Sequence, residues 1–198
     1  NCDIDTLYSN ITLKDYFDYE KSNFDFVIGN PPWGFDYSDS EKESFKEKYR
    51  TAKGKVVESY DLFLEQSLIK LNPYGEMAFV LPEAILNVKI HQPVRDEIIN
   101  GSKITSIQYL GNVFDGVQCP CIILQIMKCP DGFSTKGMRI ILQDEDFIIN
   151  SERLTTPECF SFTIKDEEYN VFKKLERNSN YVYLKGNAEF ALGIVTGD

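Results

Sequence analysis

An amide, two prolines and a tryptophan follow one another directly after a short apolar run. The run is residues 26–28, and the four residues are Asn30, Pro31, Pro32 and Trp33. In an open α/β sheet, ligands bind beyond the carboxyl ends of the strands, which is where these four residues would fall. The pattern therefore predicts a functional site at this point of the chain.

A planar amino group is the substrate that these residue types suit. The 6-amino group of adenine is a poor nucleophile, because its lone pair is delocalised into the ring. The side-chain oxygen of Asn30 and the carbonyl oxygen of Pro31 can accept its two hydrogens and help the nitrogen become tetrahedral. Prolines lack an N–H and fix φ, so they end the strand rigidly and can leave that carbonyl facing the substrate. We predict Asn30, Pro31 and Trp33 as catalytic residues, with the Trp33 ring stacked on the base.

A strand that ends in a proline turn beside a packed tryptophan is the plain structural alternative. Each of these features is common by itself. All four residues together, after an apolar strand in an α/β pattern, are much less common. The combination favours the chemical interpretation.

The elements that would position this site form an α/β pattern. Apolar runs predict strands at residues 26–28, 77–81, 104–109 and 122–126. Apolar residues three and four apart predict a helix from Tyr60 to Leu71, which the Asn72-Pro73-Tyr74-Gly75 segment ends, and a second helix around residues 94–99. This order predicts a doubly wound parallel sheet with right-handed crossovers.

The last two of these strands are separated only by residues 110–120. This connection is too short for a helical crossover, so we expect the pair to be antiparallel and to lie at the sheet edge. Beyond Lys128 the pattern weakens. Residues 140–142 and 147–149 predict a further hairpin, and residues 166–177 a helix with a polar face.

The charge of the chain limits what it can bind by itself. A net charge of −10 opposes tight nonspecific binding of nucleic acid, because Lys and Arg contacts to phosphates supply most of that affinity. One stretch runs against this trend, and two interpretations of it stay open: a solvated helix with charge pairs, or a loop that faces phosphates. Its basic residues are Lys42, Lys46, Lys48, Arg50, Lys53 and Lys55.

Composition also bears on metal binding and on location. The five cysteines form no CxxC pair and the only histidine is His91, so we predict reduced, buried thiols and no metal site. No apolar run is long enough to span a bilayer, and the start of the chain has no targeting pattern. We therefore expect a cytoplasmic protein with no membrane association.

The segment from Ile11 to Lys128 resembles the gamma group of bacterial adenine-specific DNA methyltransferases, the group of the TaqI enzyme. The Asn-Pro-Pro-Trp tetrapeptide at residues 30–33 is similar to the catalytic motif of that family. The resemblance implies part of a Rossmann-like, S-adenosylmethionine-dependent methyltransferase fold, a parallel sheet with an antiparallel edge strand. It also implies methyl transfer to the exocyclic 6-amino group of an adenine rotated out of double-stranded DNA.

The resemblance also implies residues that bind S-adenosylmethionine. Asp15 and Tyr16 are similar to the acidic-aromatic motif that holds the adenine of the cofactor. Phe63 resembles a phenylalanine lining the same pocket, where Pro32 would contact the ring as well. Helix core is the alternative role for Phe63. Asp3 resembles the acidic residue that binds the ribose hydroxyls.

A second aromatic residue is implied for the target base. Residues 109–114 are similar to the segment that places the edge of a phenylalanine against the flipped adenine. We therefore assign Phe114 to the target base together with Trp33. The alternative role for Phe114 is a hydrophobic anchor of the hairpin formed by the last two strands.

Two departures from the family indicate a fragment of a longer restriction-modification protein. The Gly-rich cofactor loop of the family is not found before these motifs, and residues 192–198 resemble the junction that leads to a target-recognition region. We interpret residues 1–128 as the C-terminal portion of a catalytic domain and 129–198 as an extension towards a target-recognition domain. Partners would be DNA and the N-terminal and target-recognition parts of the same protein.

Two other interpretations of the sequence are a methyltransferase with another substrate and a non-catalytic fragment. Methyltransferases that act on RNA bases or on protein glutamine also use Asn-Pro-Pro-aromatic, but the long stretch from Phe35 to Ser59 and the extension favour DNA. A non-catalytic assembly fragment would explain the acidic charge and the absent Gly-rich loop. The intact residues 30–33 argue against it.

Overall fold

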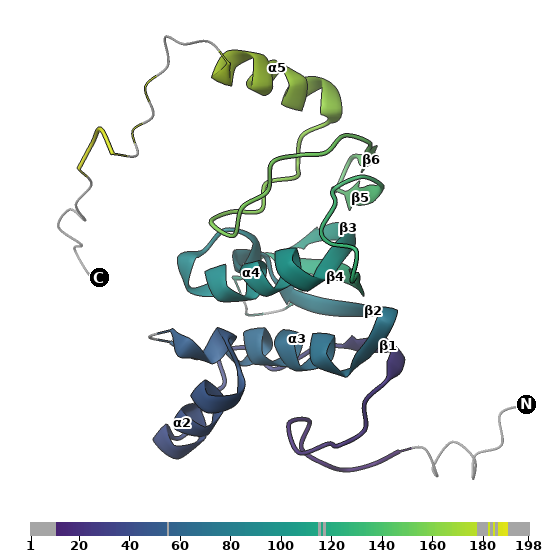
Figure 1. Cartoon of the computed structure of the whole chain (residues 1–198), viewed down its shortest axis with the longest axis vertical. Helices are drawn as coiled ribbons and strands as arrows, with labels where there is room; N and C mark the ends of the chain where they lie inside the picture. The colour runs from purple at the N-terminus through teal and green to yellow at the C-terminus, as the bar shows by residue number, and fades with distance from the viewer. Residues whose placement is uncertain are drawn as a thin grey trace, which may run out of the picture. The chain divides into compact units, whose positions relative to one another are not determined.

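A mixed six-stranded sheet is the framework of the protein (Figure 1). The computed structural model describes residues 11–54, 56–114, 116, 118–177, 182, 184 and 186–189. The chain divides into a unit of residues 1–163, which holds the sheet, and a unit of residues 164–198. Within the sheet the strand order is β1-β2-β4-β3-β5-β6.

The predicted strands and helices are confirmed, with ends that differ by a few residues, except that the second strand begins six residues earlier than predicted and includes the segment of residues 72–75 that was expected only to end the helix. In the first unit the strands are β1 (Phe24–Gly29), β2 (Leu71–Pro82), β3 (Ser102–Gly111), β4 (Cys121–Lys128), β5 (Met138–Ile141) and β6 (Asp146–Ile149). Its helices are α2 (Asp39–Lys48), α3 (Ser59–Lys70) and α4 (Gln92–Gly101), with short 3-10 turns η1 (Thr51–Lys53), η2 (Glu83–Leu86) and η3 (Lys89–His91). The second unit contains α5 (Asp166–Glu176).

Strand β4 corrects one expectation. It pairs antiparallel with β3, as predicted, but it lies between β2 and β3 and not at the sheet edge. Ile122, Leu124 and Ile126 on this strand are almost fully buried, as befits an interior strand. The short connection makes β4 antiparallel to β3 but does not determine on which side of β3 it pairs. The opposite side of β3 pairs with β5, in parallel.

The pairing places the carboxyl ends of three strands at one edge of the sheet. Strand β1 is parallel to β2, and both β2 and β3 are antiparallel to β4, so β1, β2 and β3 run in the same direction. The register of β1 against β2 shifts near Gly75. A side chain on Gly75 would come within 2.9 Å of the Phe24 carbonyl oxygen, so this close approach requires glycine.

The two faces of β1 differ in burial. Helices α3 and α4 pack against β2 and β3 and against each other (Figure 1). Val27 packs into the main core, together with Met77 and Phe79 of β2. Phe26 and Ile28 alternate with Val27 and so face the other side, where they are 70% and 82% exposed.

The basic stretch after the tetrapeptide contains a helix in which two lysines form ion pairs. Ser38 and Glu41 form a reciprocal capping box at the start of α2. The Nζ atom of Lys42 lies 2.9 Å from a carboxylate oxygen of Asp36, and that of Lys46 lies 2.6 Å from Glu43. For residues 39–48 the structure therefore shows the helix with charge pairs, not the loop.

An aromatic cluster fixes the same region to the rest of the unit. Phe17 packs at its border, between the Asp15–Tyr16 segment and α2. The buried members of the cluster are Tyr37, Phe45, Tyr49, Ala52, Val57 and Leu62. Because Leu62 belongs to α3, this cluster joins residues 35–57 to the helix that follows them.

Residues beyond 128 complete the sheet before the first unit ends. Strands β5 and β6 pair antiparallel, and β5 adds to β3. The structural division falls between Thr163 and Ile164, further along the chain than the functional boundary predicted after residue 128. None of the helices in the described ranges is both long and apolar enough to cross a membrane.

Candidate active site

Trp33 and Phe114 meet at the carboxyl edge of the sheet. Trp33 follows β1 and Phe114 follows β3, and the ends of these strands lie at the same edge because the strands run in the same direction. The ring centroids are 5.3 Å apart and the ring planes are inclined by 83°, an edge-to-face contact. Two of the predicted site residues, about eighty positions apart in sequence, are therefore neighbours in space.

The two rings touch each other and do not stand apart by the thickness of a base. A planar base placed between two aromatic groups needs about 3.5 Å on either side. A base could therefore enter between Trp33 and Phe114 only if one of the two rings moved. Phe114 is 40% exposed, so its side chain has room to do so.

The four residues of the tetrapeptide differ in burial. Pro31 is buried, Trp33 is half-buried against the main core, and Asn30 and Pro32 are exposed. The Nε1 atom of Trp33 is buried without a hydrogen-bond partner in the described part of the chain. Exposed Asn30 at the end of β1 can present an amide to a ligand, while Pro31 anchors the turn.

Helix α3 holds the tetrapeptide through Ser59. The Ser59 hydroxyl donates a hydrogen bond of 2.5 Å to the carbonyl oxygen of Pro32, and the Ser59 side chain is fully buried. Ser59 is the first residue of α3. The start of this helix is thus tied to the loop that carries the predicted catalytic residues.

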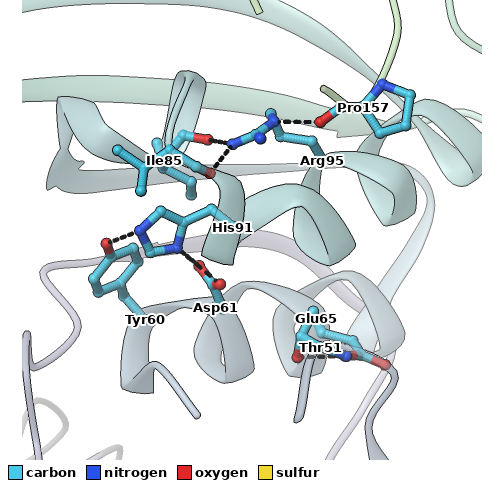
Figure 2. Close-up of polar contacts among 9 residues, drawn as sticks. Thr51, Tyr60, Asp61, Glu65, Ile85, His91, Arg95 and Pro157 are labelled. Atoms are coloured by element: carbon cyan, nitrogen blue, oxygen red, sulfur yellow. Dashed lines mark hydrogen bonds and ion pairs between the residues drawn. The ribbon is translucent and has the colours of Figure 1, made fainter. Parts of the chain in front are cut away.

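A buried polar network lies on the next two residues of α3 (Figure 2). The Nδ1 atom of His91 lies 2.9 Å and 3.1 Å from the two Asp61 carboxylate oxygens, and its Nε2 atom lies 2.7 Å from the Tyr60 hydroxyl. A proton on Nδ1 satisfies both contacts, because Asp61 then accepts and Nε2 accepts from Tyr60. Burial raises the pKa of Asp61, and the hydrogen bond from His91 counteracts this rise.

Two of the predicted cofactor residues, Tyr16 and Phe63, meet at the following turn of α3. The rings of Tyr16 and Phe63 are stacked, with centroids 4.9 Å apart and planes inclined by 6°. The Tyr16 hydroxyl lies 2.7 Å from the Ser67 hydroxyl. Asp15 is exposed, and one of its carboxylate oxygens accepts from the backbone N–H of Phe17 at 2.8 Å.

Lys70 fixes the segment that continues from Tyr16. Its buried ammonium group donates to the carbonyl oxygens of Tyr19 and, at 3.1 Å, of Lys21. The same group lies 5.7 Å from the centroid of the Tyr16 ring. Burial lowers the pKa of Lys70, and nearby Lys14 adds to the effect.

A cavity of about 330 Å³ adjoins Tyr16. It extends along β1 to the exposed ring of Phe26. Its lining residues are Thr12, Lys14, Tyr16, Tyr19, Phe24, Phe26 and Val27.

The structure thus brings the candidate residues together in two groups. Trp33 and Phe114 form one, and Tyr16 and Phe63 the other, with Asp15 adjacent in sequence. Asp3 and the 192–198 segment lie outside the described residues.

Sequence reasoning missed the residues that connect these groups. Ser59 gave no signal of its own. His91 stood out only as the single histidine of the sequence, and Asp61 lies in a predicted helix without any pattern that marks it. A histidine and a carboxylate thirty residues apart could be paired only by knowing that η3 packs beside α3.

Solved structures place the fold in a known class. The chain resembles a class I S-adenosylmethionine-dependent methyltransferase from Listeria monocytogenes, with a TM-score of 0.50 at 19% identity over 81% of this chain and 44% of that one. It resembles equally the methyltransferase subunit of a type I restriction-modification system from Streptococcus thermophilus, with a TM-score of 0.50 at 22% identity over 85% and 34% of the two chains. The fold is that of class I methyltransferases.

The family follows from the sequence match. A model of the Eco57I restriction-modification methylase family matches residues 3–114, which is more than half of the chain. The protein therefore belongs to this family. The matched range contains all the candidate site residues discussed above.

Curated relatives agree with this family. The type II methyltransferase M.VspI from a Vibrio species is 26% identical over 96% of this chain and 47% of its own length. The type II restriction enzyme and methyltransferase RM.Eco57I from Escherichia coli is 26% identical over 91% of this chain and 19% of its own length. The chain spans less than half of each of these relatives.

Proposed function

We propose that this chain is the target-base part of an adenine-specific DNA methyltransferase of a restriction-modification system. In this proposal the methyl group passes from S-adenosylmethionine to the exocyclic 6-amino group of an adenine rotated out of double-stranded DNA. The observation that carries the proposal is the contact between Phe114 and Trp33, which follows Asn30 by three residues, at the sheet edge where ligands of this fold class bind.

The roles of the chain's residues follow from their chemistry. The Asn30 amide oxygen and the Pro31 carbonyl accept the two hydrogens of the amino group and orient the nitrogen lone pair. Trp33 stacks on the face of the base, and Phe114 contacts its edge. No general base with a strongly shifted pKa is needed, because the methylated ammonium product is a strong acid. Positioning and charge placement then provide most of the catalysis.

The residues near α3 suit the adenine ring of the cofactor. Phe63 and Pro32 offer apolar surface, and the exposed carboxylate of Asp15 can accept from an amino group. Tyr16 and Phe63 lie in direct contact, so a ring would bind beside this pair or separate it. When bound, S-adenosylmethionine supplies an electrophilic methyl group on its sulfonium.

The exposed apolar face of β1 supports a larger catalytic domain. Soluble monomers rarely leave contiguous apolar surface uncovered, and Phe26 and Ile28 are 70% and 82% exposed on neighbouring positions of one face. We propose that an N-terminal part of the same protein, which carries the Gly-rich cofactor loop, covers this face. A target-recognition part would supply most of the positive charge that DNA binding needs.

Asn30→Ala in the complete protein tests the proposed function. We expect methyl transfer to duplex DNA to fall by at least a thousandfold, while the dissociation constant for S-adenosylmethionine changes less than threefold, because the amide acts on the base. A tritiated-methyl transfer assay and calorimetry measure the two quantities. Asn100→Ala, an exposed position at the end of α4, is the control and should keep full activity.

Two results would contradict the proposal. Activity of Asn30→Ala within threefold of the wild type would remove Asn30 from the catalytic role. Transfer by the wild-type protein to RNA or to a glutamine peptide, and not to duplex DNA, would assign the same site to another substrate.

A further inference from the structure

The first turn of α3 connects two structures that sequence reasoning treated separately. Ser59 donates to the carbonyl of Pro32, 27 residues earlier in the sequence, and the next two residues, Tyr60 and Asp61, bind His91 of η3. The side chains of this turn and of His91 are buried, with at most 4% of their surface exposed. They are Ser59, Tyr60, Asp61 and His91. Figure 2 shows His91 between Tyr60 and Asp61.

The Asp61–His91 contact holds this turn in place. A buried carboxylate without a partner is strongly unfavourable, so any rotation of the turn that separates Asp61 from His91 is opposed. The Tyr60 hydroxyl adds a second contact to the same imidazole ring. Ser59, one residue earlier, therefore occupies a fixed position relative to η3.

The Pro32 carbonyl is an effective point at which to hold the tetrapeptide. The carbonyl shares a planar peptide unit with the N–H of Trp33, so fixing the one orients the backbone that leads into the other. In the other direction, Pro31 and Pro32 have φ locked by their rings, which leaves few free torsions between Pro32 and Asn30. One hydrogen bond can thus restrict the positions of both predicted catalytic side chains.

We propose that Ser59, held by the buried Asp61–His91 pair, is a positioning residue that sets the geometry of Asn30 and Trp33 through the Pro32 carbonyl. This inference rests on the proposed function. It assigns to α3 a part in catalysis that is distinct from the contact of Phe63 with the cofactor. Ser59 touches neither the base nor the cofactor in this role.

Ser59→Ala in the complete protein is the main test. We expect kcat to fall about tenfold to a hundredfold, the size of effect that a misplaced catalytic group produces. The KM for DNA and the dissociation constant for S-adenosylmethionine should change less than threefold, because phosphate contacts and the cofactor pocket do not depend on this bond. Titration of cofactor sites counts the folded molecules, so that kcat refers to folded enzyme alone.

Ser102→Ala is the matched control. Ser102 is also fully buried, and its hydroxyl also donates to a backbone carbonyl, that of Ile98 at 2.8 Å. It lies at the start of β3, whereas the site lies beyond the ends of the strands. Its loss should lower stability about as much as the loss of Ser59 does and leave kcat within twofold of the wild type.

Two further variants test how Ser59 acts. Ser59→Thr keeps the hydroxyl and should retain kcat within fivefold of the wild type. Asp61→Asn keeps an acceptor for His91 but weakens the charge-assisted bond, and it should lower kcat about threefold to tenfold without a change in KM. If Asp61 acts through Ser59, adding Asp61→Asn to Ser59→Ala should lower kcat little further than Ser59→Ala does by itself. Independent structural defects would lower kcat additively instead.

The outcomes separate this inference from the proposed function. If the wild type methylates DNA and Asn30→Ala does not, but Ser59→Ala equals Ser102→Ala in kcat, the positioning role is wrong and the proposed function stands. If Ser59→Ala does not fold, the test passes to Asp61→Asn. A kcat of this variant equal to that of the wild type would overturn the positioning role. A wild-type protein that methylates no DNA overturns the proposed function itself.

Discussion

Trp33 shows how one side chain can serve both folding and recognition. Its ring packs on the main core and against Phe114, while its indole N–H is buried without a partner among the described residues. A buried donor without an acceptor costs about 1–3 kcal/mol. A ligand that supplied an acceptor, or that let the ring shift into water, would recover part of this energy.

Replacement of Trp33 should weaken the grip on the flipped base. Stacking on a base is worth about 1–3 kcal/mol, so Trp33→Ala in the complete protein should reduce affinity for the extrahelical base about tenfold to a hundredfold. Trp33→Phe keeps an aromatic face and should lose much less. Fluorescence of 2-aminopurine at the target position reports base flipping in both variants. Equal losses in the two would show that packing, not stacking, is what Trp33 contributes.

At the level of elements, α3 organises the candidate site. Its first residue holds the tetrapeptide, Phe63 and Ser67 hold Tyr16, and Lys70 holds the segment after Tyr16. Buried Glu65, on the same helix, accepts from the backbone N–H groups of Arg50 and Thr51. The helix thus fixes several segments that precede it in sequence, which periodicity alone could not reveal.

Helix α4 has a corresponding role for the end of the first unit. Arg95 is fully buried and donates to the carbonyl oxygens of Ile85, Val88, Pro157 and Glu158, at 2.6 to 3.0 Å. Figure 2 shows Arg95 with Ile85 and Pro157. Burial lowers the pKa of Arg95. The guanidinium therefore joins η2, the residue before η3 and the 157–158 segment through their backbone carbonyl groups.

Removal of this guanidinium should destabilise the first unit. Arg95→Met leaves several buried carbonyl groups without a donor, and we expect a loss of about 3 kcal/mol in the free energy of unfolding. Urea unfolding measures the change. Arg139→Met removes an exposed ion pair with Asp146 and should have a much smaller effect. If the two variants are equally stable, the hydrogen bonds of Arg95 to the buried carbonyl groups do not stabilise the unit as described.

The elements show what the sequence could and could not predict. The period of the apolar residues identified α3, α4 and four strands, because burial on one face leaves a regular pattern. It gave no signal for α2, where the charged residues left a helix and a loop as open interpretations, although Ser38 and Glu41 carry the spacing of a capping box. The place of β4 and the Asp61–His91 pair depend on which elements become neighbours, and that is set by tertiary packing.

At the scale of the whole molecule, the sheet is covered unevenly. Helices α3 and α4 cover the side on which Val27 and Met77 are buried, while Phe26 and Ile28 stand exposed on the other side. The cavity beside Tyr16 adjoins this exposed side. A cofactor bound there would be enclosed only when further protein lies against β1.

The 198-residue chain alone should therefore bind S-adenosylmethionine weakly. Tyr16 and Phe63 would contribute one aromatic surface, and Asp15 one acceptor, but no Gly-rich loop is present in the sequence to approach the methionine moiety. A dissociation constant of 1 μM corresponds to about −8.2 kcal/mol, which these few contacts cannot supply against the entropy lost on binding. We expect a dissociation constant of about a millimolar or weaker by calorimetry, and at least a hundredfold tighter binding by the complete protein under the same conditions. Micromolar binding by the chain alone would mean that residues 1–198 already contain the whole cofactor site, and that the exposed face of β1 has another purpose.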